Sequence, residues 1–295
     1  MFEQLGLIGC GLMGGSFALA LKRAGLVKRV VGYSKSPSTT ERAFQLGVID
    51  VEAPSALLAV SGADIVLVAV PVGASEAAFK AIRHMVSPRM LVMDVGSTKC
   101  DVVAAALRGL REHVGSFVPA HPIAGKEQSG VENADANLYT GKQVILTPTA
   151  DTQSIHLKQA QDVWTAIGCS VVQMSPESHD AAFAAVSHLP HLIAFALMNA
   201  IADQPDSLEY LALAGPGFRD FSRIAGSDPK VWRDILLANR DKLLAQSRLF
   251  RDHLQMFEAA MQGGDSVALQ SLITQASLTR ANWHMNLQSS DDRYV

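Results

Sequence analysis

The stretch Gln4-Leu5-Gly6-Leu7-Ile8-Gly9-Cys10-Gly11-Leu12-Met13-Gly14 decides the fold of this chain. Its apolar start predicts a buried strand, and the alanine-rich segment 14–24 predicts a helix directly after it. Between them, Gly9, Gly11 and Gly14 form the G-x-G-x-x-G pattern of a dinucleotide-binding turn. The first glycine allows the tight turn, the second lets a pyrophosphate approach the backbone, and the third lets helix and strand pack closely. The alternative, a glycine-rich turn in an ordinary sheet, is disfavoured because strand, helix and second strand follow in the required order.

The end of the second expected strand bears on which dinucleotide binds. An acidic residue there would accept hydrogen bonds from a free ribose 2′-hydroxyl. Instead, Tyr33 is followed by Ser34, Lys35 and Ser36, with Thr39 nearby, a set rich in donors with one positive charge. This set favours a 2′-phosphate and therefore NADP, with NAD as the alternative; the competing interpretation is a polar surface loop with a solvated lysine. The cofactor-binding residues expected from the sequence are Gly9, Gly11, Leu12, Met13, Gly14, Ser34, Lys35, Ser36, Thr39, Val70 and Pro71.

Outward from this turn, residues 1–174 alternate short apolar runs with amphipathic stretches, as the strands and crossover helices of a parallel sheet do. After Pro176 the strand signal disappears, and apolar residues recur at three-and-four spacing. The sequence therefore predicts an α/β fold, with a Rossmann-type, doubly wound, mostly parallel sheet over residues 1–174 and an all-α domain over residues 175–295. Strands are expected at 4–8, 29–33, 65–70, 90–94, 117–119, 143–147 and 170–173. Helices are expected at 14–24, 39–46, 76–84, 100–110, 152–167, 179–202, 232–261 and 265–283.

Composition narrows the class of function. The 295 residues are 48% hydrophobic, enough for two domains with sizeable cores, and the formal net charge is only −3. Without a run of like charges, neither a nucleic acid nor a membrane surface is an expected partner. Cys10, Cys100 and Cys169 are odd in number and lack metal-ligand spacing, which indicates reduced thiols in a cytoplasmic protein and no metal site. Apolar runs such as 65–72 fall short of the roughly 18 residues that span a bilayer, and no signal sequence is expected.

Three stretches concentrate polar residues where the apolar pattern predicts core. Asp94-Val95-Gly96-Ser97-Thr98-Lys99 and His121-Pro122-Ile123-Ala124-Gly125 each follow an expected strand, where open α/β sheets place their ligands. The third stretch lies in the helical half and comprises Ser187-His188-Leu189-Pro190-His191 and the runs 217–225 and 227–234. Together they are candidates for a site of small-molecule chemistry.

With these segments in order, the sequence closely resembles the prephenate and arogenate dehydrogenase family of tyrosine biosynthesis, also called cyclohexadienyl dehydrogenases. The resemblance rests on segments 6–16, 96–99, 121–125, 187–191 and 217–225 and covers nearly the whole chain. It implies an N-terminal Rossmann domain, a helical domain that forms a homodimer, and NAD(P)-dependent oxidative decarboxylation. Prephenate, converted to 4-hydroxyphenylpyruvate, is the expected substrate. Arogenate, converted to tyrosine, or both substrates, are the alternatives, because no residue reads the keto or amino group that distinguishes them.

The resemblance assigns roles to particular side chains. It makes His121 the hydrogen-bond acceptor for the substrate 4-hydroxyl, and an imidazole near its ordinary pKa of about 6.5 suits proton transfer at neutral pH. Ser97 is expected to hydrogen-bond both His121 and that hydroxyl and so to fix the tautomer. Arg223 is expected to hold a substrate carboxylate, because a guanidinium grips two oxygens at once. Supporting roles fall to His191, His179 and Asp180, around the substrate side chain and the site entrance, and to Glu127 and Trp232 in the pocket wall.

Each assignment has a competing interpretation. His121, before a proline, is also suited to closing a turn, Ser97 to capping the next helix, and His188 to satisfying helix packing. For Arg219, Arg223 and Arg233 the alternative is a surface ion pair with a neighbouring aspartate. The rival enzyme is a β-hydroxyacid dehydrogenase, which would work through a lysine on the helical domain. The rival from another class is a non-catalytic nucleotide sensor that keeps the fold.

Overall fold

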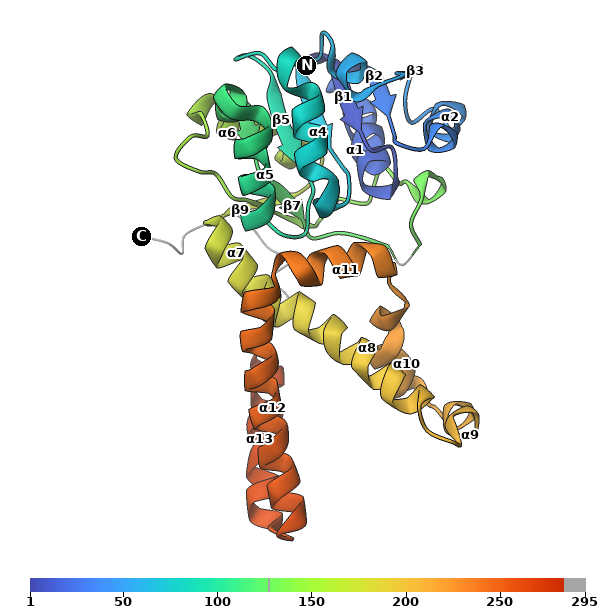
Figure 1. Ribbon diagram of the computed structural model, residues 1–295, viewed down its shortest axis with the longest axis vertical. Coiled ribbons are helices and arrows are strands. Elements are labelled where there is room, and N and C mark those ends of the chain that lie inside the picture. The colour runs from blue at the N-terminus through green and yellow to red at the C-terminus, as the bar shows by residue number, and fades with distance from the viewer. Residues whose placement is uncertain (127, 284–295) are drawn as a thin grey trace.

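The computed structural model describes residues 1–126 and 128–283, with an α/β part above an all-helical part (Figure 1). The α/β part is built on a six-stranded parallel sheet in the order β3-β2-β1-β4-β5-β6. The chain winds in one direction from β1 to β3 and in the other from β4 to β6, which is the doubly wound topology that the sequence predicts. The strands are β1 (Phe2–Ile8), β2 (Val27–Tyr33), β3 (Val51–Glu52), β4 (Ile65–Val68), β5 (Leu91–Asp94) and β6 (Phe117–Val118).

Helices cover both faces of this sheet. On one face, α1 (Leu12–Arg23) and α6 (Ser154–Ala166) belong to one buried apolar cluster. On the other, α3 (Ala56–Val60), α4 (Ser75–Ile82) and α5 (Cys100–Leu110) belong to a second. Because both faces are covered, every residue of β4 and β5 is buried. The remaining helix, α2 (Pro37–Gln45), packs beside β2 and β3 at the sheet edge.

Beyond β6 the structure departs from the single sheet that the sequence predicts. The expected strand 117–119 ends as β6 at Val118, and an unpredicted strand, β7 (Ala120–Pro122), begins a separate sheet with β8 (Gln143–Leu146) and β9 (Ser170–Gln173). In this sheet β7 runs antiparallel to β8, whereas β8 and β9 are parallel. Pro119 stands at the division; it has no N–H to continue a ladder, and its carbonyl accepts from Thr147. The division turns the chain so that β7 leaves the end of the large sheet.

The helical part begins with one continuous helical segment, composed of α7 (Pro176–Phe183), a single π-helical turn (Ala184–His188) and α8 (Leu189–Ala202). Figure 1 shows two arms, one formed by α8 and α9 and the other by the α12–α13 hairpin, with α11 lying across the underside of the α/β part. The expected helix 232–261 is divided at Asn239 into α11 and α12. The later helices are α9 (Ser207–Ala212), α10 (Pro216–Ser222), α11 (Pro229–Ala238), α12 (Arg240–Gln262) and α13 (Ser266–Asn282).

Among the described residues, five short strands and α-helices, β3, β7, α3, α9 and α10, were not expected from the sequence. They have two to seven residues each, too few for a hydrophobic period to show. The other expected elements are present with ends shifted by a few residues. Tertiary contacts, which a sequence pattern does not register, set such ends.

The continuous segment Pro176–Ala202 corrects the expectation that every apolar run is too short to cross a membrane. Its 27 residues are long and apolar enough by length and composition, and 22% of the most apolar window is buried inside the chain. Helices with this profile also occur inside proteins that never enter a membrane. Most of this apolar helical surface is therefore not buried inside the chain.

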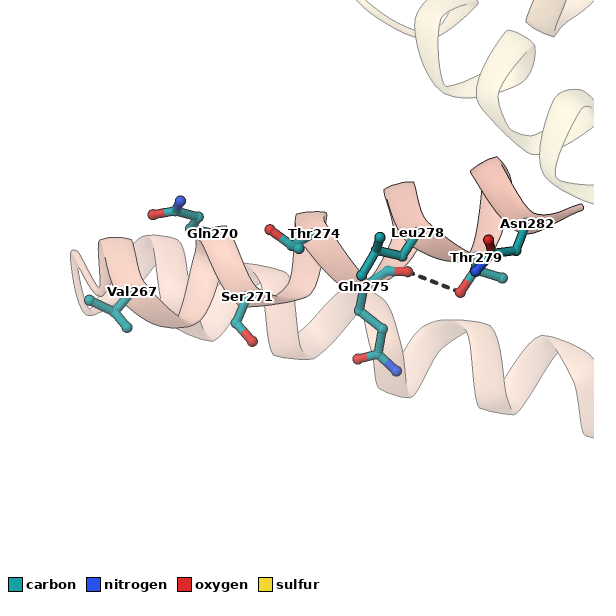
Figure 2. A pocket seen from close by; sticks show the side chains of 8 residues that line it. All are labelled: Val267, Gln270, Ser271, Thr274, Gln275, Leu278, Thr279 and Asn282. Carbon is teal, nitrogen blue, oxygen red and sulfur yellow. Dashed lines mark hydrogen bonds between the residues drawn. The ribbon is translucent and has the colours of Figure 1, made fainter.

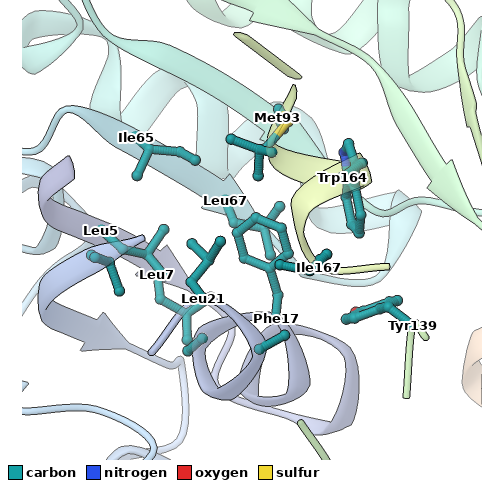
Figure 3. Close-up of a cluster of buried hydrophobic side chains, with 14 of the residues drawn as sticks. Leu5, Leu7, Phe17, Leu21, Ile65, Leu67, Met93, Tyr139, Trp164 and Ile167 are labelled. Carbon is teal, nitrogen blue, oxygen red and sulfur yellow. The ribbon is translucent and has the colours of Figure 1, made fainter. Parts of the chain in front are cut away.

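The larger apolar cluster is centred on α1 and the face of β1 and β4 (Figure 3). Phe17 is fully buried there, with its ring centroid 5.0 Å from that of Trp164 and 6.5 Å from that of Tyr139. Because α1 also begins at the glycine turn, the packing of Phe17 fixes the start of the helix that the dinucleotide motif requires.

We expect Phe17→Ala to lower the free energy of unfolding by about 3–5 kcal/mol, because it leaves a cavity between α1 and α6. Urea denaturation followed by fluorescence measures this change. The control is Ile155→Ala on α6, where the side chain is 58% exposed and the expected change is within about 0.5 kcal/mol. Equal losses in the two variants would contradict the role given to Phe17.

Candidate active site

The glycine turn after β1 has the geometry that its sequence predicts. Gly9 has φ +97°, and a Cβ there would lie 2.2 Å from the carbonyl oxygen of Ala69. At Gly14 a Cβ would lie 2.1 Å from the carbonyl oxygen of Gly9, so both positions require glycine. A Cβ at Gly11, which precedes α1, would meet none of the described residues within 4 Å. The start of α1 therefore faces open space, as a pyrophosphate site requires.

A cavity of about 340 Å³ lies against this turn. It is lined by residues 11–13, 69–72 and 95–97, which follow β1, β4 and β5, and by Ser129 and Gly130. The open helix end and the space before Gly11 fit a dinucleotide, and Leu12, Met13, Val70, Pro71 and Ser97 all line the cavity. Two further lining residues, Val231 and Ile235, come from α11 of the helical part and were not predicted.

The polar loop after β2 is tied to the glycine turn. Ser34 accepts a hydrogen bond at Oγ from the backbone N–H of Cys10 (2.8 Å), and its own N–H donates to Thr40 Oγ1 (3.0 Å). Ser36 Oγ pairs with Ser38 Oγ (2.8 Å), and the side chain of Lys35 is exposed. The loop is therefore preorganised beside the turn. From Tyr33 to Thr40 it contains no acidic residue.

His121 is the middle residue of β7, and a chain of hydrogen bonds holds its ring. His121 Nδ1 lies 2.8 Å from His179 Nε2, and His179 Nδ1 lies 2.8 Å from Asp180 Oδ1. The same carboxylate accepts the backbone N–H groups of Lys99 (2.8 Å) and Cys100 (2.9 Å) at the start of α5. His179 and Asp180 are 0% and 2% exposed. The chain thus joins α7 to β7 and α5.

Charge fixes the direction of these hydrogen bonds. Burial alone would raise the pKa of Asp180, but hydrogen bonds from His179, Cys100 and Lys99 outweigh it and hold this pKa well below its usual range. Burial lowers the pKa of His179, and burial together with the neighbouring histidines and the Lys99 ammonium lowers that of His121 well below 6.5. With both rings neutral and Asp180 charged, His179 donates from Nδ1 and accepts at Nε2, so His121 donates from Nδ1. His121 Nε2 is left as a lone-pair acceptor.

Three expectations about these residues change. His179 and Asp180 lie behind His121 rather than at the site entrance, and the pKa of His121 lies below rather than near its ordinary value. Within residues 1–126 and 128–283, no hydrogen bond joins Ser97 to His121, and the partner at Nδ1 is His179. The sequence could not show this, because α7 and β7 meet only in the folded chain.

A buried ion pair positions the neighbouring backbone. Lys99 Nζ donates to Asp94 Oδ2 (2.5 Å) and to the carbonyl oxygen of Ala120 (2.7 Å). Asp94 accepts the N–H of Ala120 (2.9 Å) at Oδ1 and that of Gly96 (2.7 Å) at Oδ2. The side chains of Lys99 and Asp94 are 0% and 2% exposed. Because Ala120 precedes His121, the pair locks β7 against the loop after β5.

The π-helical turn Ala184–His188 sets the relative orientation of two histidines. In an uninterrupted α-helix, His179 and His191 would lie about 120° apart around the axis. A π-turn accommodates one extra residue, which reduces this angle to about 20°. Both rings therefore lie on nearly the same face of the continuous segment.

His191 and Arg223 line a second cavity, of about 530 Å³. His191 Nδ1 donates to the carbonyl oxygen of Ser187 (2.9 Å), and its ring stacks on Trp232, with centroids 3.6 Å apart and planes at 21°. Burial and the nearby Arg223 guanidinium lower the pKa of His191, whereas its hydrogen bond to Ser187 opposes this shift. Lys126 and Gln128 also line this cavity. Glu127 lies outside the described residues.

The two cavities adjoin one loop. Gly125, Lys126 and Gln128 line the cavity of Arg223, whereas Ser129 and Gly130 line the cavity of the glycine turn. This loop follows His121 directly. The neutral imidazole of His121 therefore stands in the strand directly before a loop that lines both the dinucleotide-type cavity and the cavity of Arg223.

For Arg219, Arg233 and His188, the structure agrees with the competing interpretations, surface ion pairs for the two arginines and helix packing for the histidine. Arg219 pairs with Asp220 (3.4 Å) and Arg233 with Asp234 (2.6 Å), as the surface ion-pair interpretation predicts. His188 is buried, with Nδ1 3.1 Å from Asn239 Nδ2, which confirms its packing role. Asn239 itself was not predicted. It lies inside the stretch 232–261 that was expected to be one helix, and its only sequence signal is the residue type, since asparagine is common at helix ends.

Comparison with known proteins follows the same division of the chain. Residues 17–173 match the family model described as prephenate dehydrogenase, nucleotide-binding domain, and residues 175–275 match prephenate dehydrogenase, dimerization domain.

Individual relatives agree with these matches. A prephenate dehydrogenase of Bacillus subtilis is 37% identical over 83% of this chain, and the chain spans 66% of that relative's length. A cyclohexadienyl dehydrogenase of Zymomonas mobilis is 33% identical over 90% of each chain. The crystal structure of prephenate dehydrogenase from A. aeolicus, in complex with hydroxyphenyl propionate and NAD+, is 36% identical and superposes with a TM-score of 0.88 over 95% of this chain and 98% of that one. These matches, with the doubly wound sheet and the helical part after it, show that the chain belongs to the prephenate dehydrogenase family of NAD(P)-dependent enzymes.

Proposed function

We propose that this enzyme oxidises prephenate with a nicotinamide cofactor and releases carbon dioxide, giving 4-hydroxyphenylpyruvate. The observation that carries the proposal is the buried chain from Asp180 through His179 to His121, which leaves one imidazole nitrogen as an acceptor in the strand directly before the loop that lines both cavities. Arogenate is the alternative substrate.

His121 Nε2 takes the proton of the 4-hydroxyl as a hydride leaves C4 of the ring. The bound nicotinamide supplies the chemistry of accepting this hydride. Loss of the ring carboxylate as carbon dioxide then makes the ring aromatic and leaves its electron pair on the 4-oxygen. His121 returns its proton to that oxygen, so the reaction releases no net proton.

Asp180 and His179 act as positioning residues. They hold the Nδ1 proton on His121, which keeps Nε2 free to accept, and the negative charge of Asp180 stabilises the imidazolium that forms. The low pKa of His121 supports this role, because the ring is neutral and ready to accept at pH 7.

Arg223 holds a carboxylate of the substrate. It shares its cavity with Lys126 and with His191, whose ring Trp232 supports by stacking. The Lys126 ammonium is ion-paired with Asp135 (3.2 Å), so the carboxylate is assigned to the guanidinium, which suits a carboxylate held by two hydrogen bonds. Ser97 lines the cofactor cavity and lies in the loop that Asp94 and Lys99 hold.

The preferred cofactor in this proposal is NADP. The support is the loop after β2, in which serines and Lys35 stand where an acid would read a free 2′-hydroxyl. The A. aeolicus relative was solved with NAD+, which keeps NAD as the alternative.

We also propose that two copies of this chain pair through the helical domain, taken as residues 175–295, with residues 1–174 as the nucleotide-binding domain. Apolar side chains such as Leu249, Leu254 and Met256 of α12 are about half exposed. Figure 2 shows Val267, Ser271, Thr274 and Leu278 along α13, at three-and-four spacing beside a shallow hollow. A second copy covers these side chains and the apolar segment 176–202. The enzyme works in the cytoplasm, where its three free cysteines stay reduced.

A two-by-two assay of prephenate and arogenate against NAD and NADP tests the proposed reaction. Prephenate with NADP is expected to give the highest kcat/KM, with one carbon dioxide and one 4-hydroxyphenylpyruvate released for each cofactor reduced. Binding of cofactor without turnover of either substrate would favour a nucleotide sensor. Oxidation of a β-hydroxyacid without carbon dioxide release would favour the rival enzyme.

His121→Asn is expected to lower kcat by about 10²–10⁴-fold, because it removes the proton acceptor. Steady-state kinetics measure the loss, and calorimetric titration with the cofactor should give an unchanged Kd. His113→Asn, on the surface of the same domain, serves as the matched control and should keep full activity. Turnover of the His121 variant within threefold of the original would remove this residue from the mechanism.

Asp180→Asn is expected to change the pH profile of kcat/KM as well as its plateau. The Asp180 charge raises the pKa of His121, so its loss lowers that pKa further and moves the acid limb to lower pH. The plateau should fall about 10–100-fold, the usual effect of losing a partner that orients a functional histidine. Asp162→Asn, at an exposed aspartate of α6, is the control. An unchanged plateau, or a limb displaced to higher pH, would contradict the positioning role.

A further inference from the structure

We propose that α11 of the helical domain supplies two cofactor-contact residues, Val231 and Ile235, which cover the nicotinamide half of the cofactor. Both side chains line the cavity against the glycine turn, although they come from the other domain. They stand four residues apart and so share one face of α11. Ile235 is 3% exposed and Val231 is 39% exposed. The cofactor site is thus built from both domains.

The sheet topology identifies the half of the cofactor that these residues meet. The start of α1 at Gly11 marks the pyrophosphate position, and the loop after β2 marks the adenosine side. Val231 and Ile235 line the cavity with residues 69–72 and 95–97, which follow β4 and β5 on the opposite side of β1. The nicotinamide therefore lies on the side that α11 covers.

Two contacts anchor this face of α11, one directly on the nucleotide-binding domain and the other on α7 within the helical domain. A Cβ at Gly73 would lie 2.9 Å from Asp234 Oδ2, so this carboxylate packs closely on the turn after β4. At the far end, buried Asn239 donates from Nδ2 to the carbonyl oxygen of Asp180 (2.7 Å). Ile235 stands between these two anchors. Asn239 comes four residues after Ile235 and therefore lies on the same side of the helix.

The wall that these residues form is apolar. Val231 and Ile235 face a cavity that also contains Leu12, Val70 and Val95. An apolar wall stabilises a ligand by removing its apolar surface from water, and it disfavours a buried charge. The nicotinamide ring is cationic when oxidised and neutral when reduced. The wall should therefore contribute more to binding of the reduced cofactor.

The test compares Ile235→Ala with the unmodified enzyme by calorimetric titration, in the absence of substrate. Two ligands are titrated. One is NADH or NADPH, whichever the unmodified enzyme binds more tightly, and the other is ADP, which lacks the nicotinamide half. Kd for the reduced cofactor is expected to rise about tenfold, as for the loss of one to two buried methylene contacts. Kd for ADP should change less than twofold. Because no substrate is present, the result is independent of the proposed reaction.

Leu237→Ala is the matched control, since this side chain lies on α11 but is 63% exposed. It should leave both dissociation constants unchanged. Val231→Ala, whose side chain is partly exposed, provides a second variant should Ile235→Ala unfold; its expected rise for the reduced cofactor is about threefold. The proposal would be overturned if a folded variant kept its Kd for the reduced cofactor within twofold of the original. An equal rise in the Kd for ADP, or an equal rise in Leu237→Ala, would also overturn it.

Discussion

The carboxylate of Asp180 is the constraint on which the rest of the site depends. It comes from the first helix of the helical domain, yet it accepts two backbone N–H groups at the start of α5 in the nucleotide-binding domain. The same group orients His179, and through it His121. A helix start favours an anion because its first N–H groups lack partners within the helix. Contact between the domains and orientation of the imidazole therefore depend on one side chain.

The buried pair of Lys99 and Asp94 does a different job. Removing two charges from water costs about as much as their attraction returns, so such a pair is a weak source of stability. Its benefit lies in geometry, because four hydrogen bonds fix the loop after β5 and the residue before His121. The loop that carries Ser97 and the strand that carries His121 are consequently held in one rigid unit.

Much of the architecture follows from local sequence. The glycine turn, the apolar strands and the change of hydrophobic period near Pro176 predict the doubly wound sheet and the helical part after it, because each depends on nearby residues. The same is true of Gly9 and Gly14, at which the structure leaves no room for a Cβ. The second sheet was not predicted, because the division at Pro119 depends on the partner strand β8. Nor were Val231 and Ile235, whose role arises only where α11 meets the other domain, or Asn239, whose partners Asp180 and His188 come from an earlier helical segment. His179 and Asp180 were found by resemblance, but their place behind His121 required the folded chain.

The π-turn has a consequence for how this segment can vary. Substitutions between His179 and His191 alter packing one side chain at a time, whereas a deletion or insertion alters the rotational phase of everything beyond it. Removing one residue would restore regular α-helix and swing His191 by about 100° around the axis, away from the face it shares with His179. The number of residues between these two histidines therefore determines the angle between their side chains around the helix axis. We therefore expect related sequences to accept substitutions in this segment more readily than insertions or deletions.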